Sequence, residues 1–196
     1  MSRHHPGSGA WPKALAIGVL AGLGLSGTSP ATAEIRKLIQ SCPGKLCAYY
    51  LPDLPKPKGW IVETEATDAN RIAVLVPAGT DFSSAEALIY GRAYLNTEKT
   101  SVEARAATSN EKWIAAAKGA KIERLPDAIR AKGGTPFQVF HYLNPENAQQ
   151  KAELVAFGED VDKEGNAYGV QIVLTTGSEA ALKKNEAAFL GILKKY

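Results

Sequence analysis

The stretch AELVAFGE at residues 152–159, the polar link DVDKEGN at 160–166 and the stretch YGVQIVLT at 168–175 decide the fold. Both apolar stretches are rich in residues that favour strands. The link between them contains Asp, Gly and Asn, which are typical of turns. The sequence therefore predicts two strands joined by a turn-rich connection.

Several segments before residue 152 also have sequence patterns typical of strands. Residues 60–65 alternate between apolar and polar side chains, residues 71–76 are almost continuously apolar, and a turn is expected at 68–70 between them. We expect these two segments to pair as a hairpin. Residues 34–41 match a short amphipathic helix. Other strands are expected at 48–51, 88–95, 121–131 and 137–143. A helix starting near Ser83 or Ser84 is the alternative for 88–95, but the aromatic residues and Gly91 favour a strand.

Two helices complete the pattern. Thr100-Ser101-Val102-Glu103 is a capping box, and Gly119 is placed to end the helix that follows. Ser178 is expected to cap a closing helix. The apolar stripes of the two helices are Val102, Ala106, Trp113 and Ala117, and Leu182, Phe189, Ile192 and Leu193. Strands in runs with two amphipathic helices predict an α+β fold, with an antiparallel-rich central sheet of about six strands flanked by helices.

The N-terminus carries the pattern of an export signal. Basic residues in 1–13 precede an apolar run at 14–25 that is too short to span a bilayer, and Ala31-Thr32-Ala33 matches an A-x-A cleavage site. We therefore expect a signal peptide at 1–33 and a single globular domain at 34–196. The expected location is the periplasm or the extracellular space, with no membrane span after cleavage.

Removal of the signal changes the charge balance. The full chain has 23 basic and 20 acidic residues, and residues 1–33 hold two of the basic ones, Arg3 and Lys13. The remaining 163 residues carry a net charge of +1. Nucleic acids and anionic membranes require clustered positive charge, so this balance argues against nucleic acid as a partner.

Cys42 and Cys47 are the two cysteines of the chain, and Pro43-Gly44-Lys45-Leu46 separates them. Two cysteines without a nearby histidine supply too few ligands for zinc. The spacing also differs from the Cys-x-x-Cys of thioredoxin-like sites. In an oxidising compartment we expect a structural disulfide around a turn, with a redox-active pair as the alternative.

Two patterns could carry chemistry. His141, the one histidine after residue 33, could serve as a general base, but the sequence shows no nucleophile elbow near it, and a hydrogen-bonded strand histidine is the simpler interpretation. Residues 160–166 begin like a calcium loop, yet its twelfth position is Gln171 instead of Glu. A plain hairpin turn is the simpler interpretation there as well. We find no phosphate, dinucleotide or metal motif, so no metal and no cofactor are expected.

Tyr90, Arg92 and Tyr94 share one face of the strand expected at 88–95. Tyrosine and arginine are common in binding surfaces. The alternative is a sheet face covered by a helix, with Arg92 reaching solvent at its edge. Trp60 and Trp113 are expected in the core. The candidate binding residues are therefore Tyr90, Arg92, Tyr94 and His141.

In this order of elements the chain resembles the PsbP-like fold, the family of the extrinsic photosystem II subunit and its bacterial relatives. The resemblance covers most of residues 47–196. Its pieces are the junction from Leu51-Pro52 into Pro57-Lys58-Gly59-Trp60, the segment 73–77, the capped helix from Thr100, the strand pair 152–159 and 168–175, and the ending at 189–196. The resemblance implies an antiparallel sheet flanked by helices that docks onto other proteins. It supplies no catalytic motif, and the photosystem role does not carry over, because the docking residues of the family have no match here.

These observations lead to a hypothesis about function. We expect an exported, soluble, non-enzymatic domain that binds a protein or a small ligand of the cell envelope. The alternatives are a small hydrolase-like enzyme that uses His141 and an envelope redox protein that uses Cys42 and Cys47.

Overall fold

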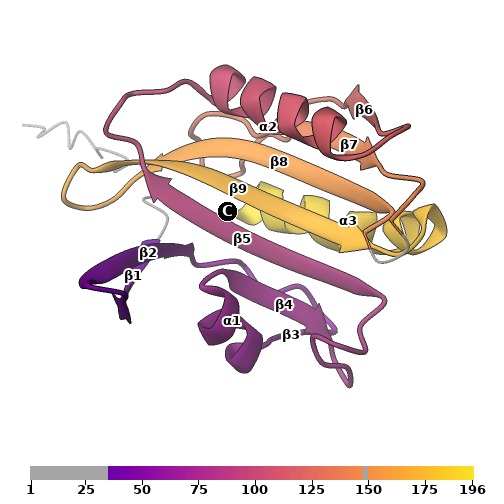
Figure 1. Ribbon diagram of the computed structural model, residues 1–196, viewed down its shortest axis with the longest axis horizontal. Helices are drawn as coiled ribbons and strands as arrows, with labels where there is room; N and C mark the ends of the chain where they lie inside the picture. Colours follow the sequence, from indigo (N-terminus) through magenta and orange to yellow (C-terminus); the bar gives the residue numbers. More distant parts are fainter. Residues whose placement is uncertain (1–34, 148–149) are drawn as a thin grey trace, which may run out of the picture.

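The computed structural model describes residues 35–147 and 150–196, which fold around one antiparallel sheet (Figure 1). The expected export signal at 1–33 lies outside the described residues. The strand order is β1-β2-β5-β9-β8-β7-β6, with β4 also paired to β5 and β3 paired to β4. The α+β class and the flanking helices are confirmed, and the sheet has nine strands where about six were expected. No helix among the described residues is long and apolar enough to cross a membrane.

The centre of the sheet is the hairpin predicted first. It pairs β8 (Ala152–Val161) with β9 (Ala167–Thr176) over ten residues of each strand. On its other side β9 pairs along its length with β5 (Ala87–Leu95). Most residues of β8 and β9 are buried, because helices cover both faces of the sheet. This explains why these strands are almost continuously apolar.

The helix α3 (Glu179–Lys195) covers one face of the sheet and α2 (Val102–Ala116) covers the other (Figure 1). The predicted Ser178 cap is confirmed, since its hydroxyl accepts a hydrogen bond from the Ala181 amide at 3.1 Å. All four predicted stripe residues of α3 are buried. In α2 the cap is Ser101, one residue later than predicted, because Ser101 is extended and accepts from the Ala104 amide. The helix reaches its C-cap at Ala117, before Gly119.

A short helix was missed between the two strands expected to form a hairpin. The strands β3 (Trp60–Val62) and β4 (Ala73–Pro77) do pair, but α1 (Thr64–Asn70) connects them. The Glu63 carboxylate accepts a hydrogen bond from the Ala66 amide and caps this helix. The strand expected at 60–65 therefore ends three residues early.

The helix expected at 34–41 is wrong. Residues Ile35–Cys42 form the edge strand β1, which pairs residue by residue with β2 (Lys45–Pro52). Pro43 and Gly44 make the turn, and Gly44 has a φ of 73°, which glycine adopts without strain. The predicted helix would be short, and a short isolated helix is not stable in water. The strand forms instead, because all eight of its residues pair with β2.

The strand expected at 121–131 is shorter than predicted. The strand β6 (Lys121–Arg124) ends before Pro126, and it pairs with β7 (Gln138–Leu143). The loop that follows β6 is held by Arg130, whose guanidinium forms a buried ion pair with Asp160 at 2.9 Å. The Ala131 amide also donates to the Lys194 carbonyl at 2.7 Å, which ties the loop to the end of α3.

Candidate protein-binding groove

An exposed groove of 410 Å³ lies between β2, the end of α1 and the C-terminal half of β5. Its walls include three tyrosines and two arginines, which are Tyr49, Tyr50, Arg71, Arg92 and Tyr94. We call it the basic groove. The structure brings Arg92 and Tyr94 together there, as their spacing on one strand predicted, and adds residues from two other elements.

Arg71 enters the groove because of how α1 ends. It adopts a left-handed conformation with φ of 60°, and its amide donates to the Thr67 carbonyl at 2.8 Å. Its guanidinium lies 4.8 Å from the centre of the Tyr49 ring. Its Nε donates to the Gln40 side-chain oxygen at 2.7 Å, so the arginine bridges α1 to the β1–β2 hairpin. Arg71 was not among the predicted binding residues, because these contacts join segments that are far apart in the chain.

Arg92 and Tyr94 occupy the opposite wall. The Arg92 Nε donates to the Gln171 side-chain oxygen at 2.7 Å, and its guanidinium lies 5.9 Å from the centre of the Tyr94 ring. The Tyr94 ring lies over Gly169, where an added Cβ would be 2.9 Å from the ring edge. These contacts fix the orientation of both side chains while Arg92 remains exposed.

Neither arginine of the groove is neutralised in the described part of the chain. The ion pairs found there join Arg124 to Asp127, Arg130 to Asp160 and Lys184 to Glu86. Arg71 and Arg92 each use one N–H on a neutral glutamine. The remaining N–H groups of each guanidinium can bind a carboxylate in a forked geometry. The groove therefore favours an acidic ligand group.

Tyr90 does not belong to this groove. It shares the face of Arg92 and Tyr94, but its ring is partly buried and contacts the core beneath α2 and the apolar cluster under α1. Burial raises the pKa of its hydroxyl, and the nearby Glu153 acts in the same direction. The covered-face interpretation thus describes Tyr90, whereas Arg92 is exposed and Tyr94 is half-buried.

His141 lies in the middle of β7, between Glu123 of β6 and Leu154 of β8. Its ring is partly buried, and its Nε2 has no hydrogen-bond partner among the described residues. A general base needs an orienting acceptor and a nucleophile within reach. The described residues do not place such groups on this nitrogen.

Cys42 and Cys47 form the predicted disulfide, with an S–S distance of 2.10 Å. The Cys42 sulfur also lies 3.4 Å from the Tyr49 hydroxyl. The disulfide therefore braces the hairpin that carries one wall of the basic groove.

The link at 160–166 is the hairpin turn that was the simpler interpretation. The Asp162 carboxylate accepts hydrogen bonds from the amides of Glu164 and Asn166, at 3.0 and 2.8 Å. The Tyr168 hydroxyl donates to the same carboxylate at 2.9 Å. Asp160 is engaged separately by Arg130. Asp162 thus organises the turn itself.

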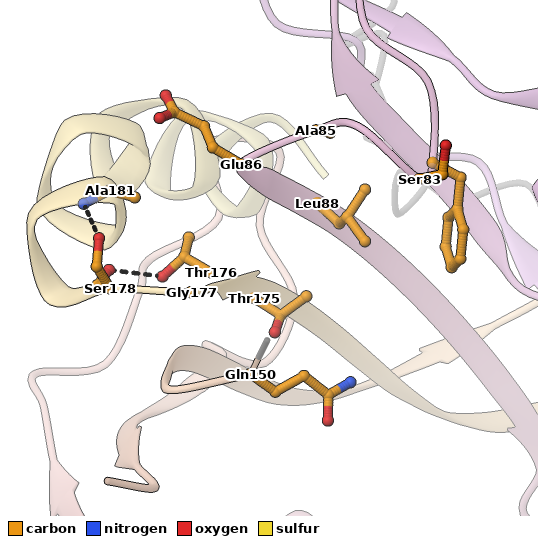
Figure 2. A pocket seen from close by; sticks show the side chains of 11 residues that line it. Ser83, Ala85, Glu86, Leu88, Gln150, Thr175, Thr176, Gly177, Ser178 and Ala181 are labelled. Atoms are coloured by element: carbon orange, nitrogen blue, oxygen red, sulfur yellow. Dashed lines mark hydrogen bonds between the residues drawn. The ribbon is translucent and has the colours of Figure 1, made fainter. Parts of the chain in front are cut away.

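A larger hollow of 650 Å³ lies where β5 begins, β9 ends and α3 begins (Figure 2). Figure 2 shows Leu88 and Thr175 on its wall, with Ser178 bonded to the Ala181 amide at its rim. The Thr175 hydroxyl is buried and makes no hydrogen bond with the described residues. Its strand partner is Glu153, whose side chain is only 4% exposed. Burial raises the pKa of Glu153 to about 7.

Glu153 falls inside the strand expected at 152–159. The signal that could have identified it is one acidic residue between apolar neighbours in a strand buried on both faces. A buried carboxyl without a cationic partner is costly when ionised. We therefore expect Glu153 to make the stability of the fold depend on pH.

No family model matches the chain, and no curated protein matches it. Among solved structures, it is similar to the Ran-binding protein Mog1p of Saccharomyces cerevisiae. The identity is 15%, the TM-score is 0.40, and the match covers 82% of this chain and 93% of that one.

Proposed function

We propose that this protein is an exported, non-enzymatic domain that binds a partner protein of the cell envelope through the basic groove. One observation carries the proposal. Two guanidiniums, Arg71 and Arg92, lie between tyrosine rings in an exposed groove, and neither is paired with an acid in the described part of the chain. Tyrosine and arginine dominate the energetically important positions of protein interfaces.

The contacts of the two arginines support a preformed binding surface. Both guanidiniums already have a bound glutamine and a nearby ring, so little side-chain freedom is lost when a partner arrives. A lysine could not provide this, because its ammonium lacks the planar fork that pairs with a carboxylate.

We also propose that the chain belongs to the PsbP-like proteins and acts outside the cytoplasm. The first part of this proposal is supported by the antiparallel sheet between two helices and by the Pro57-to-Trp60 junction that leads into β3. Export is supported by the pattern of residues 1–33 and by the disulfide, a bond typical of oxidising compartments. N-terminal sequencing of the natural product should find Glu34, and an intact Met1 would contradict export.

A pull-down from envelope extract tests the binding function. The bait proteins are the wild type, the double variant Arg71→Ala/Arg92→Ala, and the control Lys118→Ala/Lys163→Ala. The control removes the same charge from exposed positions outside the groove. We expect one set of proteins to be retained by the wild type and the control and lost from the arginine variant. Equal retention by all three baits, or by none, would refute the groove as a binding surface.

A further inference from the structure

We propose that the partner presents an acidic, extended segment that pairs with the outer edge of β1 and reaches the basic groove. This inference rests on the proposed function and names the chemistry of the partner. It concerns the hairpin formed by Ile35–Cys42 and Lys45–Pro52, which we call the hairpin arm.

The hairpin arm concentrates positive charge. Between residues 35 and 52 it carries Arg36, Lys37 and Lys45 and no acidic residue. Arg71 and Arg92 lie beside β2 of the arm, and Arg71 is bonded to Gln40 of β1. Since the chain after residue 33 has a net charge of only +1, these five cations form a local basic field. Such a field attracts and orients an acidic partner.

The arm also presents a backbone edge that no other described strand pairs with. Among residues 35–147 and 150–196, β1 is the last strand of the sheet on its side, and it is eight residues long. The two-residue turn makes Cys42 and Lys45 a hydrogen-bonded pair. Every second residue of β1 before Cys42 therefore also directs its backbone N–H and C=O groups toward β2. The amides of Lys37, Ile39 and Ser41 therefore point outward. An extended peptide can add to such an edge as another strand.

Side chains of the arm fit an added strand on both faces. Ile39 is 50% exposed and Leu46 is 73% exposed, and their register places them on one face. Arg36, Gln40 and Lys45 lie on the other face, where Arg71 bonds to Gln40. A partner strand that alternates acidic and β-branched residues would place its carboxylates on the face of Arg36 and Lys45 and its methyl groups on the face of Ile39 and Leu46.

The arm is accessible and braced. It is joined to the rest of the sheet by one register pair, Tyr50 with Ala93, so its outer part projects beside the end of β5 (Figure 1). The Cys42–Cys47 disulfide holds its tip. A braced strand that projects from the sheet is open to an incoming chain and loses little freedom when it binds.

Three octapeptides test this proposal with the full-length mature protein. ETETETET offers acidic charge and a complete set of backbone amides, KTKTKTKT reverses the charge, and EPEPEPEP keeps the charge but lacks half of the amide donors. Binding is measured by fluorescence anisotropy at low salt. We expect ETETETET to bind at least about tenfold more tightly than either other peptide, and added salt to weaken it. The variant Arg36→Glu/Lys37→Glu should lose this preference, while Lys118→Glu/Lys163→Glu should keep it.

Hydrogen exchange followed by NMR provides the decisive readout. Bound ETETETET should slow exchange at the amides of Lys37, Ile39 and Ser41, and leave those of Leu38 and Gln40 unchanged. Equal binding of ETETETET and EPEPEPEP, or no new protection at the outer amides, would overturn strand addition. Binding to phosphatidylglycerol vesicles without binding to ETETETET would overturn it in favour of a membrane surface. If the peptides fail but the arginine variant still loses its partner in the pull-down, only this inference falls.

Discussion

Replacement of Glu153 by Gln should remove a pH-dependent loss of stability. Glu153 lies on β8 between Thr175 of β9 and Tyr142 of β7, and it is 4% exposed. Burial raises the pKa of its carboxyl from 4.5 to about 7 in the folded protein. Tyr90 and Tyr142 are the other titratable groups that interact with it. Glutamine keeps the size of the side chain and removes the titration.

The direction in which the unfolding free energy changes with pH depends on which state, folded or unfolded, keeps the Glu153 proton. Between pH 4.5 and about 7 the folded protein keeps the Glu153 proton, while the unfolded chain releases it. The contribution of this group is therefore fully present below pH 4.5 and is lost as the pH rises through about 7. A shift of this size corresponds to about 3 kcal/mol of unfolding free energy, at ~1.4 kcal/mol per pH unit.

Urea unfolding of the wild type and Glu153→Gln at pH 5 and pH 8 measures this difference. All other groups titrate in both proteins, so the comparison isolates Glu153. We expect the wild type to lose most of the ~3 kcal/mol relative to the variant between these pH values. The exposed Glu123→Gln variant is the control and should follow the wild type. If the wild type and Glu153→Gln had the same pH dependence, the buried, proton-retaining state of Glu153 would be refuted.

Three other changes have defined outcomes. Arg130→Ala leaves the buried Asp160 carboxylate unpaired and should lower the unfolding free energy by about 3–5 kcal/mol. The control Lys132→Ala, at an exposed position, should lower it by less than ~0.5 kcal/mol. Similar urea midpoints for both variants would contradict the role of this ion pair. Cys42→Ser/Cys47→Ser opens a short loop and should cost about 2 kcal/mol, measured by urea unfolding without reductant, and an unchanged midpoint would show that the disulfide does not stabilise the fold. His141→Ala should keep the partner at wild-type levels in the pull-down, because β9 and β8 separate β7 from the groove strand β5; loss of the partner, or of a hydrolytic activity present in the wild type, would favour the enzymatic alternative.

The predictable part of the fold is the part in which local pattern and tertiary burial agree. The apolar runs at 152–159 and 168–175 predict β8 and β9, and these two strands pair with each other in the structure. The helix α3 has a serine cap and an apolar stripe, and all four residues of the stripe are buried. Each signal in these elements indicates the same structure as its neighbours.

The errors lie where local signals are weak or where distant contacts decide. The helix expected at 34–41 rests on the single stripe of Ile35, Leu38 and Ile39, and pairing with β2 makes Ile35–Cys42 a strand instead. The helix α1 has seven residues, and its cap is a glutamate side chain, which is not among the favoured cap residues.

The candidate site was partly predictable for the same reason. Arg92 and Tyr94 share a strand face, which spacing alone reveals. Arg71 reaches the groove through a left-handed helix end and a bond to Gln40, 31 positions earlier in the chain. No local pattern encodes such a contact. Sequence therefore predicts two of the five named groove residues, Arg92 and Tyr94, and the fold brings the other three beside them.

Site-specific photocrosslinking tests the central claim most directly. Benzoylphenylalanine is placed at Tyr94 in the groove and, as the control, at Lys163 in the β8–β9 turn, and each variant is irradiated in its native host. We predict a discrete protein adduct from position 94 that is lost when Arg71→Ala and Arg92→Ala are added, and no such adduct from position 163. No adduct from position 94, or an adduct that persists without the two arginines, would contradict the groove as the protein-binding surface.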